Sequence, residues 1–355
     1  MSSFAIGVDL GGTNLRISAV DEHGRQLETI TTGTEVARGR DVVIGEMCNA
    51  ILALSGKFQS KGTLLGIGVG VPGLVDLDTG MLRQSPNLPG WHDYPVKAEI
   101  ERRIHAPVVL ENDANAAALG EKWLGAGKDV DSLCMITMGT GVGGGIILDG
   151  SIWHGMTGMA GELGHVTVNP EGPPCPCGNR GCLEQYASAT AIKRMAIEGI
   201  ATGKAPDLAR AMSESPEFSA KVVHQMASNG DATAQKIFDS VGRALGIAVA
   251  NYINIFNLPM YVIGGGASSG WDAFSPALHE EVEARSFVYK VTKPEAALPA
   301  RGRTMINRAM LGSEAGLIGA AYLGIKLGGS KSGDQDRGDQ NRADQTPKQV
   351  AGTQN

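Results

Sequence analysis

The sequence lacks the features that would direct it to a membrane. It contains no run of 18 consecutive apolar residues, which a membrane-spanning helix requires. Its first residues, Met1 to Phe4, lead directly into an apolar segment without a basic region typical of a signal peptide. We therefore expect a cytoplasmic protein with no membrane partner.

The sequence also lacks an excess of basic residues. Lysine and arginine number 31 against 37 aspartates and glutamates, so the formal net charge is −6. Nucleic-acid binding needs a basic surface that this balance does not indicate, and we expect no nucleic-acid partner. A chain of 355 residues with 42% hydrophobic content is long enough for two domains that need no disulfide bonds.

Cysteine is scarce, but three of the five copies lie close together. Cys175, Cys177 and Cys182 fall within eight residues, and with His165 they form the pattern H-x9-C-x-C-x4-C. Three thiolates and one imidazole complete a tetrahedral zinc site and leave no position open for a water molecule. We therefore predict a structural zinc, with three incidental thiols as the alternative.

Strands alternate with helices in both halves of the sequence, which indicates an α/β protein. We expect strands over 4–10, 15–20, 65–71, 107–110, 132–138, 146–148 and 260–263, and helices over 42–54, 96–104, 114–123 and 313–323, with a mostly helical stretch over 187–257. Residues 328–355 contain almost no apolar side chains, so we predict a disordered tail there.

Two segments of the sequence share one pattern. Residues 11–21 and 139–149 each run from a glycine turn that follows a strand, through a second strand, to an acidic turn. Such a repeat is typical of two similar domains. Two unrelated hairpins would produce the same spacing.

Glycine is abundant, with 50 residues, and two glycine motifs can be excluded as nucleotide sites. Residues 139–144, GTGVGG, match G-x-G-x-x-G, but an apolar strand follows where a dinucleotide site requires a helix. Residues 125–128 resemble the end of a P-loop. However, Lys122 stands in place of its first glycine and Asp129 in place of its serine or threonine.

A glycine-rich hairpin turn offers a different phosphate site, because its backbone N–H groups are unobstructed. Two such turns, one in each half, would hold a triphosphate from both sides. The candidate nucleotide-binding residues are Asp9, Gly11, Gly12, Thr13, Asn14, Thr140, Gly141, Gly264, Gly265 and Gly266. Asp9 would orient Mg²⁺ through water, and the two threonines would donate hydroxyl groups. Glycines that only permit tight turns are the alternative.

Four motifs together resemble the ROK family (repressors, open reading frames, kinases). They are DLGGT at 9–13, END at 111–113, GELGH at 161–165 and CPCGNRGCLE at 175–184. They occur in the family's order and spacing across about residues 4–325, and the sequence is most similar to the bacterial glucokinases of the family. The tail from residue 328 has no counterpart in the family pattern.

The resemblance implies the actin-like ATPase fold, which is ribonuclease H-like. In it, two similar domains with mixed sheets flanked by helices enclose a cleft. The N-terminal domain would comprise residues 1–115 and be joined by the C-terminal helix 312–326. The C-terminal domain would comprise residues 116–311 and contain the zinc motif at 165–182. ROK kinases are commonly homodimers and sometimes homotetramers, so we expect an oligomer.

The resemblance also implies transfer of the γ-phosphate of ATP, bound with Mg²⁺, to the 6-hydroxyl of glucose. Asp113 would be the general base. The implied sugar-binding residues are Gly73, Asn87, Asn112, Asp113, Glu162, His165 and Glu184. One nitrogen of His165 would bind zinc and the other would donate to a sugar hydroxyl. Without the motif, Asp113 would be interpreted as a helix cap.

Several other functions remain open at this point. Within the family, the hexose could be N-acetylglucosamine, N-acetylmannosamine, mannose or fructose, and polyphosphate could replace ATP. A sugar-sensing regulator would carry a helix-turn-helix before the kinase-like core, for which the nine residues up to Asp9 leave no room. An actin-like ATPase without a sugar site would not need the zinc cluster or the Asn112–Asp113 pair.

Overall fold

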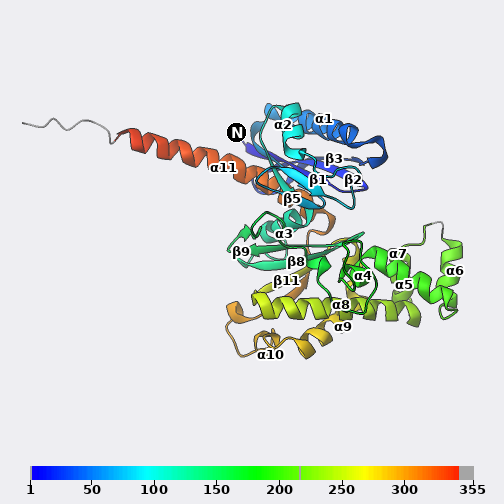
Figure 1. Ribbon diagram of the computed structural model, residues 1–355. Helices are drawn as coiled ribbons and strands as arrows, with labels where there is room; N and C mark the ends of the chain where they lie inside the picture. Colours follow the sequence, from blue (N-terminus) through cyan, green and yellow to red (C-terminus); the bar gives the residue numbers. More distant parts are fainter. Residues whose placement is uncertain (1, 216, 344–355) are drawn as a thin grey trace, which may run out of the picture.

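The computed structural model describes residues 2–215 and 217–343 and contains two five-stranded mixed sheets (Figure 1). The elements of the first half are β1 (Ser2–Leu10), β2 (Asn14–Asp21), β3 (Gln26–Gly33), α1 (Arg40–Gln59), β4 (Gly62–Val71), β5 (Leu74–Asp76), β6 (Met81–Gln84), α2 (Val96–Ile104), β7 (Val108–Asn112) and α3 (Asp113–Leu124). Those of the second half are β8 (Leu133–Met138), β9 (Val142–Leu148), β10 (Ser151–Ile152), α4 (Glu184–Ala187), α5 (Ala189–Ala201), α6 (Pro206–Glu214), α7 (Ala220–Ser228), α8 (Ala232–Phe256), β11 (Met260–Gly264), α9 (Trp271–Arg285), α10 (Tyr289–Thr292) and β12 (Met305–Arg308). The last helix is α11 (Ala315–Ala343).

The two sheets have the same topology. Their strand orders are β3-β2-β1-β4-β7 and β10-β9-β8-β11-β12. In each sheet the first three strands pair antiparallel and the last two add in parallel. The β1–β2 and β8–β9 hairpins occupy equivalent places, which confirms the repeat seen in the sequence.

The helices and sheets stack in alternating layers (Figure 1). Helices α1 and α2 cover the outer face of the first sheet, and α8 and α9 lie on the outer side of the second. Between the sheets, α11 packs on β1 and β4, α3 packs on β8 and β9, and the two helices contact each other. The chain therefore crosses between the two halves where α3 and α11 meet.

Glycine allows α11 to lie directly on the first sheet. A Cβ atom added at Gly68 of β4 would lie 1.9 Å from the carbonyl oxygen of Ala320, and one at Gly7 of β1 would lie 2.4 Å from that of Leu317. Both distances are far below van der Waals contact. Much of the unusual glycine content therefore serves close helix packing as well as turns.

The structure differs from the expected elements at several points. The strand expected over 146–148 begins at Val142, because Gly143, Gly144 and Gly145 are part of β9. A Cβ atom at Gly145 would lie 2.6 Å from that of Ala118 on α3, so this glycine permits close packing and makes no turn. Strands β3, β5, β6, β10 and β12 and helices α9 and α10 were not predicted from the sequence.

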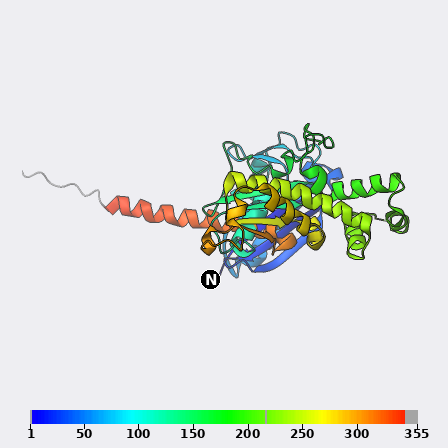
Figure 2. The same cartoon turned by 90° about the horizontal axis from the view of Figure 1, so that it is seen from below.

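Helix α11 continues well beyond the expected end at residue 323. It runs to Ala343, through the first part of the stretch 328–355 that was expected to be disordered, and projects from the body (Figure 2). Extending an existing helix is less costly than starting one, because each added residue gains a hydrogen bond without a new nucleus. The remainder of that stretch, 344–355, lies outside the described residues. No helix in the described part of the chain has the length and apolarity to cross a bilayer.

Candidate active site

A cavity of about 370 Å³ lies between the two halves. The carboxyl ends of the parallel strands β1, β4, β7, β8 and β11 all supply residues to it, as is usual for ligand sites in α/β sheets. Thirteen of the predicted site residues line it: Asp9, Gly11, Gly12, Gly73, Asn87, Asn112, Asp113, Thr140, Gly141, Glu162, His165, Glu184 and Gly265.

Four predicted nucleotide-binding residues do not line this cavity. Thr13 and Asn14 are exposed where β2 begins, and the carbonyl of Asn14 accepts a hydrogen bond of 2.8 Å from Gly11 N. Gly264 is buried as the last residue of β11. Gly266 lines a neighbouring cavity instead.

The N-terminus of α3 presents Asp113 to the cavity. Asn112 is the N-cap of the helix: its Oδ1 accepts from the backbone N–H groups of Ala114 at 2.8 Å and Asn115 at 3.1 Å. Its Nδ2 donates to the carbonyl of Gly73 at 3.0 Å. The cap that the sequence analysis considered at position 113 is therefore at Asn112, and Asp113 is the first helical residue.

The carboxyl group of Asp113 is held in an environment that favours its protonated form. Burial, reinforced by the charge of Asp9 and more weakly by that of Glu162, raises the pKa of Asp113 to about 7. A hydrogen bond from Ala114 N at 2.9 Å to its Oδ1 opposes this shift. A carboxyl with this pKa exchanges a proton near neutral pH, which suits a general base.

Asp9, near the end of β1, lies beside the start of α11, where a Cβ atom at Gly316 would be 3.4 Å from its Cγ. Burial raises the pKa of Asp9, while the guanidinium of Arg16 lowers it. Arg16 stands opposite Asp9 in the β1–β2 register and donates to the carbonyl of Ser313 at 2.6 Å. It also forms an ion pair with Glu314. These contacts hold the glycine turn of Gly11 against the chain that enters α11.

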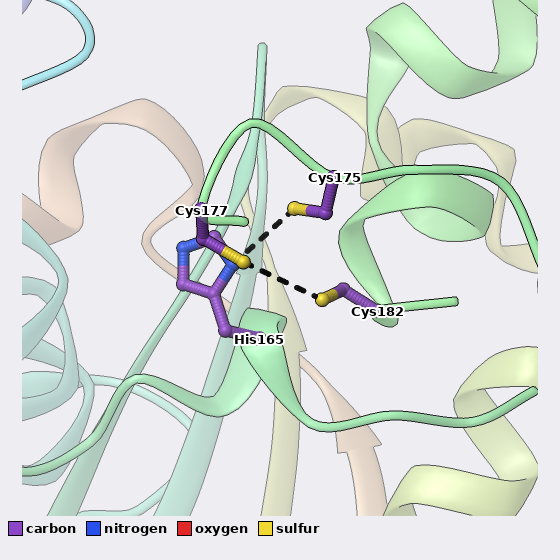
Figure 3. A group of neighbouring side chains, drawn as sticks. All are labelled: His165, Cys175, Cys177 and Cys182. Atoms are coloured by element: carbon purple, nitrogen blue, oxygen red, sulfur yellow. Dashed lines mark hydrogen bonds between the residues drawn. The ribbon is translucent and has the colours of Figure 1, made fainter. Parts of the chain in front are cut away.

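His165, Cys175, Cys177 and Cys182 converge in the second half (Figure 3). Their four ligand atoms lie within 4.8 Å of one another. Cys177 Sγ is 3.7 Å from Cys182 Sγ, and Cys175 Sγ is 3.7 Å from His165 Nδ1. Two sulfur atoms on one tetrahedral zinc, each about 2.3 Å from it, lie about 3.8 Å apart. The donor set and spacing thus fit a zinc ion.

His165 connects this cysteine cluster to the cavity. Its Nδ1 faces the thiols, while its Nε2 lies 3.9 Å from Glu162 Oε2. Glu184 is also adjacent to both the cysteine cluster and the cavity. Its Oε1 is 3.9 Å from Cys175 Sγ, and its Oε2 accepts from Val142 N at 3.0 Å. The cysteine cluster therefore adjoins two carboxylates that line the cavity.

A second cavity of about 580 Å³ adjoins the first at Gly139 and Thr140. Its lining is more apolar and also includes residues of α5, α7, α8 and the turn after β11: Ala189, Ile192, Ser219, Ala220, Lys221, His224, Phe238, Gly266, Ala267 and Ser269. Thr140 and Gly266 of its lining were predicted as nucleotide-binding residues, whereas the residues from α5, α7 and α8 were not, because no local pattern singles them out. Only their three-dimensional arrangement marks them as a site.

A model of the ROK family matches residues 5–326. The chain belongs to the ROK family. It is 40% identical over 320 residues to a glucokinase of Halalkalibacterium halodurans, covering 90% of this chain and 94% of that one. It is 44% identical over 278 residues to a glucokinase of Thermotoga maritima, covering 78% of this chain and 86% of that one.

A solved structure shows the same fold. A ROK family glucokinase from Streptomyces griseus, in complex with glucose and AMPPNP, is 33% identical with a TM-score of 0.75. The match covers 90% of this chain and 98% of that one. The two similar mixed sheets of this ROK protein therefore form the actin-like ATPase fold, which confirms the predicted fold class.

Proposed function

We propose that this ROK protein is an ATP-dependent hexose kinase, specifically a glucokinase that phosphorylates the 6-hydroxyl of glucose. The observation that carries the proposal is the placement of Asp113. It is a half-buried carboxyl with a pKa of about 7, at a helix N-terminus, in a cavity between two halves of an actin-like fold. Its relatives named glucokinase support the choice of reaction.

Asp113 would act as the general base. A hydroxyl attacks a phosphoryl group more readily when a nearby carboxylate accepts its proton. Ionised Asp113 would orient the 6-hydroxyl and take its proton as the bond to phosphorus forms. The backbone N–H groups at the start of α3 stabilise the ionised carboxylate before this transfer.

The remaining polar residues of the cavity suit a sugar. Glu162 and Glu184 offer acceptors, His165 Nε2 offers a donor, and Asn112 and Asn87 offer amides. Gly73 would shape the backbone of the sugar site: its φ is +110°, a Cβ atom there would lie 2.2 Å from the carbonyl of Gln84, and its own carbonyl accepts from Asn112 Nδ2. One carboxylate or amide can form hydrogen bonds with two adjacent sugar hydroxyls.

ATP would bind across the two connected cavities. The apolar cavity would hold the adenosine, and the phosphates would follow the turns at Gly11–Gly12 and Gly139–Gly141 and the backbone at Gly265. Asp9 would hold Mg²⁺ through water, and this ion would neutralise phosphate charge when bound. Thr140 would add a hydroxyl donor, whereas Thr13 and Asn14 shape the first turn.

The cysteine cluster would bind a structural zinc ion. All four ligand positions belong to His165, Cys175, Cys177 and Cys182, so no position is left for activating water. Binding through Nδ1 would fix the tautomer of His165 and leave the Nε2 proton for the sugar. The zinc would thus organise the sugar site without taking part in the reaction.

Two further proposals concern the whole chain. The halves would form domains of residues 1–115 and 116–311, with the C-terminal helix, predicted over 312–326 and present as α11, packed on the first and the zinc motif in the second. A homodimer or homotetramer remains our expectation for the assembly.

A coupled assay of the purified protein against a panel of hexoses tests the function. The panel comprises glucose, mannose, fructose, N-acetylglucosamine and N-acetylmannosamine, each with ATP or polyphosphate as donor. We expect the highest kcat/KM for glucose with ATP. A clear preference for another hexose would replace the substrate, and ATP hydrolysis that no sugar stimulates would refute the kinase.

A further inference from the structure

Glu111 is a buried carboxylate for which the reaction has no direct use. It is 2% exposed and immediately precedes the Asn112–Asp113 pair. Its Oε1 accepts from the backbone N–H of Asn112 at 2.9 Å and from Nδ2 of Asn115 at 3.0 Å. Its Oε2 pairs with His154 Nε2 at 2.7 Å. One side chain thus connects the start of α3 to a histidine from the other half.

His154 is the second residue of the loop 153–161, which leads from β10 directly to Glu162. The loop contacts the first half again at Gly158, whose φ is +90°: a Cβ atom there would lie 2.8 Å from Leu77 Cγ and 3.1 Å from the carbonyl of Val75. Its last residue, Gly161, is packed against the Oδ1 of Asn115, a buried atom without a hydrogen-bond partner among the described residues. Both ends of the loop are therefore attached beside α3.

We propose that the pair of His154 and Glu111 is a latch that positions the loop 153–161, and with it Glu162, relative to Asp113. The inference rests on the proposed function, because the geometry that it maintains is that of the sugar site. Both are positioning residues: they touch the segments that carry Asn112, Asp113 and Glu162. Neither residue lines the cavity.

Charge and burial make this latch stronger than an exposed ion pair. Glu111 is enclosed by protein, so loss of its partner would leave a buried carboxylate oxygen without a donor. The hydrogen bond from His154 to Glu111 raises the pKa of the imidazole, which is the direction expected for a charged pair. By contrast, His92 pairs with Asp93 at 2.9 Å on an exposed surface within one half.

The kinetic test compares His154→Ala with His154→Gln, whose amide can still donate to Glu111, and with His92→Ala as the matched control. We expect His154→Ala to raise KM for glucose about tenfold, the scale of a lost donor to a buried carboxylate. We expect KM for ATP and kcat to change less than about twofold. His154→Gln should restore most of the affinity, and His92→Ala should behave as the wild type. Equal losses for both substrates would overturn the proposal.

Two further measurements address the coupling itself. In a double-mutant cycle, the effect of His154→Ala should largely disappear in a Glu111→Gln background, because the pair is already broken there. Hydrogen exchange of the sugar-free protein should become faster over 153–161 and at the start of α3 in His154→Ala, but not in His92→Ala. Unchanged exchange would refute the latch. This measurement needs no substrate, so it separates failure of the latch from failure of the kinase proposal.

Discussion

At the scale of single residues, Asp113 shows a conflict between chemistry and stability. Its folded-state pKa of about 7 lies above the value of about 3.9 in an unfolded chain. Between these pH values the folded protein holds a proton that the unfolded protein has lost. Stability therefore falls as pH rises through this window, and the loss is complete above pH of about 7.

Asp113→Asn should separate the two effects. An amide cannot accept the hydroxyl proton, so kcat should fall at least about 10²-fold, while sugar and ATP still bind. The neutral amide avoids a half-buried charge, so Tm should rise by about 1 °C or more at pH 8, the scale of about 1 kcal/mol in a chain of 355 residues. The gain should vanish near pH 4. Steady-state kinetics and calorimetry measure these changes, and a near-normal rate would place the base elsewhere.

The pH dependence of the wild type gives an independent test of Asp113. The base must be ionised, so kcat/KM for glucose should decrease about tenfold per pH unit below pH of about 7. Residual activity of Asp113→Asn should lack this decrease. A wild-type profile that stays flat down to pH 5 would contradict the raised pKa.

Site residues could be predicted from the sequence where the residues that act together lie close to one another along the chain. The cysteines and His165 lie within 18 residues, so their spacing alone indicated the cluster that the structure assembles. Arg16 and Glu314 are 298 residues apart, and His154 and Glu111 are 43 apart. Neither pair has a motif of its own. Such partners are defined only when the two sheets and the last helix come together.

At the scale of elements, some glycines within helices and strands are required by close packing, as beneath α11, whereas others have open space around them. Gly68→Ala should destabilise the protein by about 1–3 kcal/mol or more, because its methyl group would overlap the carbonyl of Ala320. Gly56→Ala is the control. Gly56 lies within α1 with open space around it, so alanine there should stabilise by about 0.5–1 kcal/mol. Denaturant unfolding measures both, and equal effects would contradict this account of the packing.

The cysteine loop offers a second prediction at this scale. Cys177→Ser should lose zinc and glucose affinity together, because the metal would fix the orientation of His165. Cys48→Ser, in the core of the first half, should retain both. Metal analysis and titration calorimetry provide the measurements. Normal glucose affinity in a metal-free Cys177→Ser protein would disprove the coupling.

Elements with strong patterns were predicted well, and those with weak patterns were missed. The buried strands β1 and β8 read as apolar runs next to glycine. Strand β3 is largely exposed and carries threonine and glutamate, while β10 has two residues, so neither has a clear period. Helix α9 contains Pro276, and a proline within a segment argues against a helix there because it lacks a backbone N–H. These elements are stabilised by contacts with neighbouring strands and helices, and the sequence does not show which elements become neighbours.

At the scale of the whole molecule, a buried carboxylate joins the two connections between the halves. Glu121, at 0% exposure, lies near the end of α3 and accepts from the N–H groups of Ala126 at 2.8 Å, Met310 at 3.1 Å and Leu311 at 2.7 Å. The first of these follows α3 and the other two precede α11. The two crossings are therefore held together at one place, beside a cavity that opens between the halves. We expect this place to serve as the hinge between the two halves.

The molecule should therefore close around the hinge when the sugar binds. Closure would exclude water from the γ-phosphate, which otherwise competes with the 6-hydroxyl for transfer. Small-angle scattering with glucose should show a smaller radius of gyration than scattering without it, and Asp113→Asn with glucose should close in the same way. Sorbitol at the same concentration is the control for solvent contrast. Profiles that coincide with and without glucose, under conditions where calorimetry shows saturation, would contradict closure.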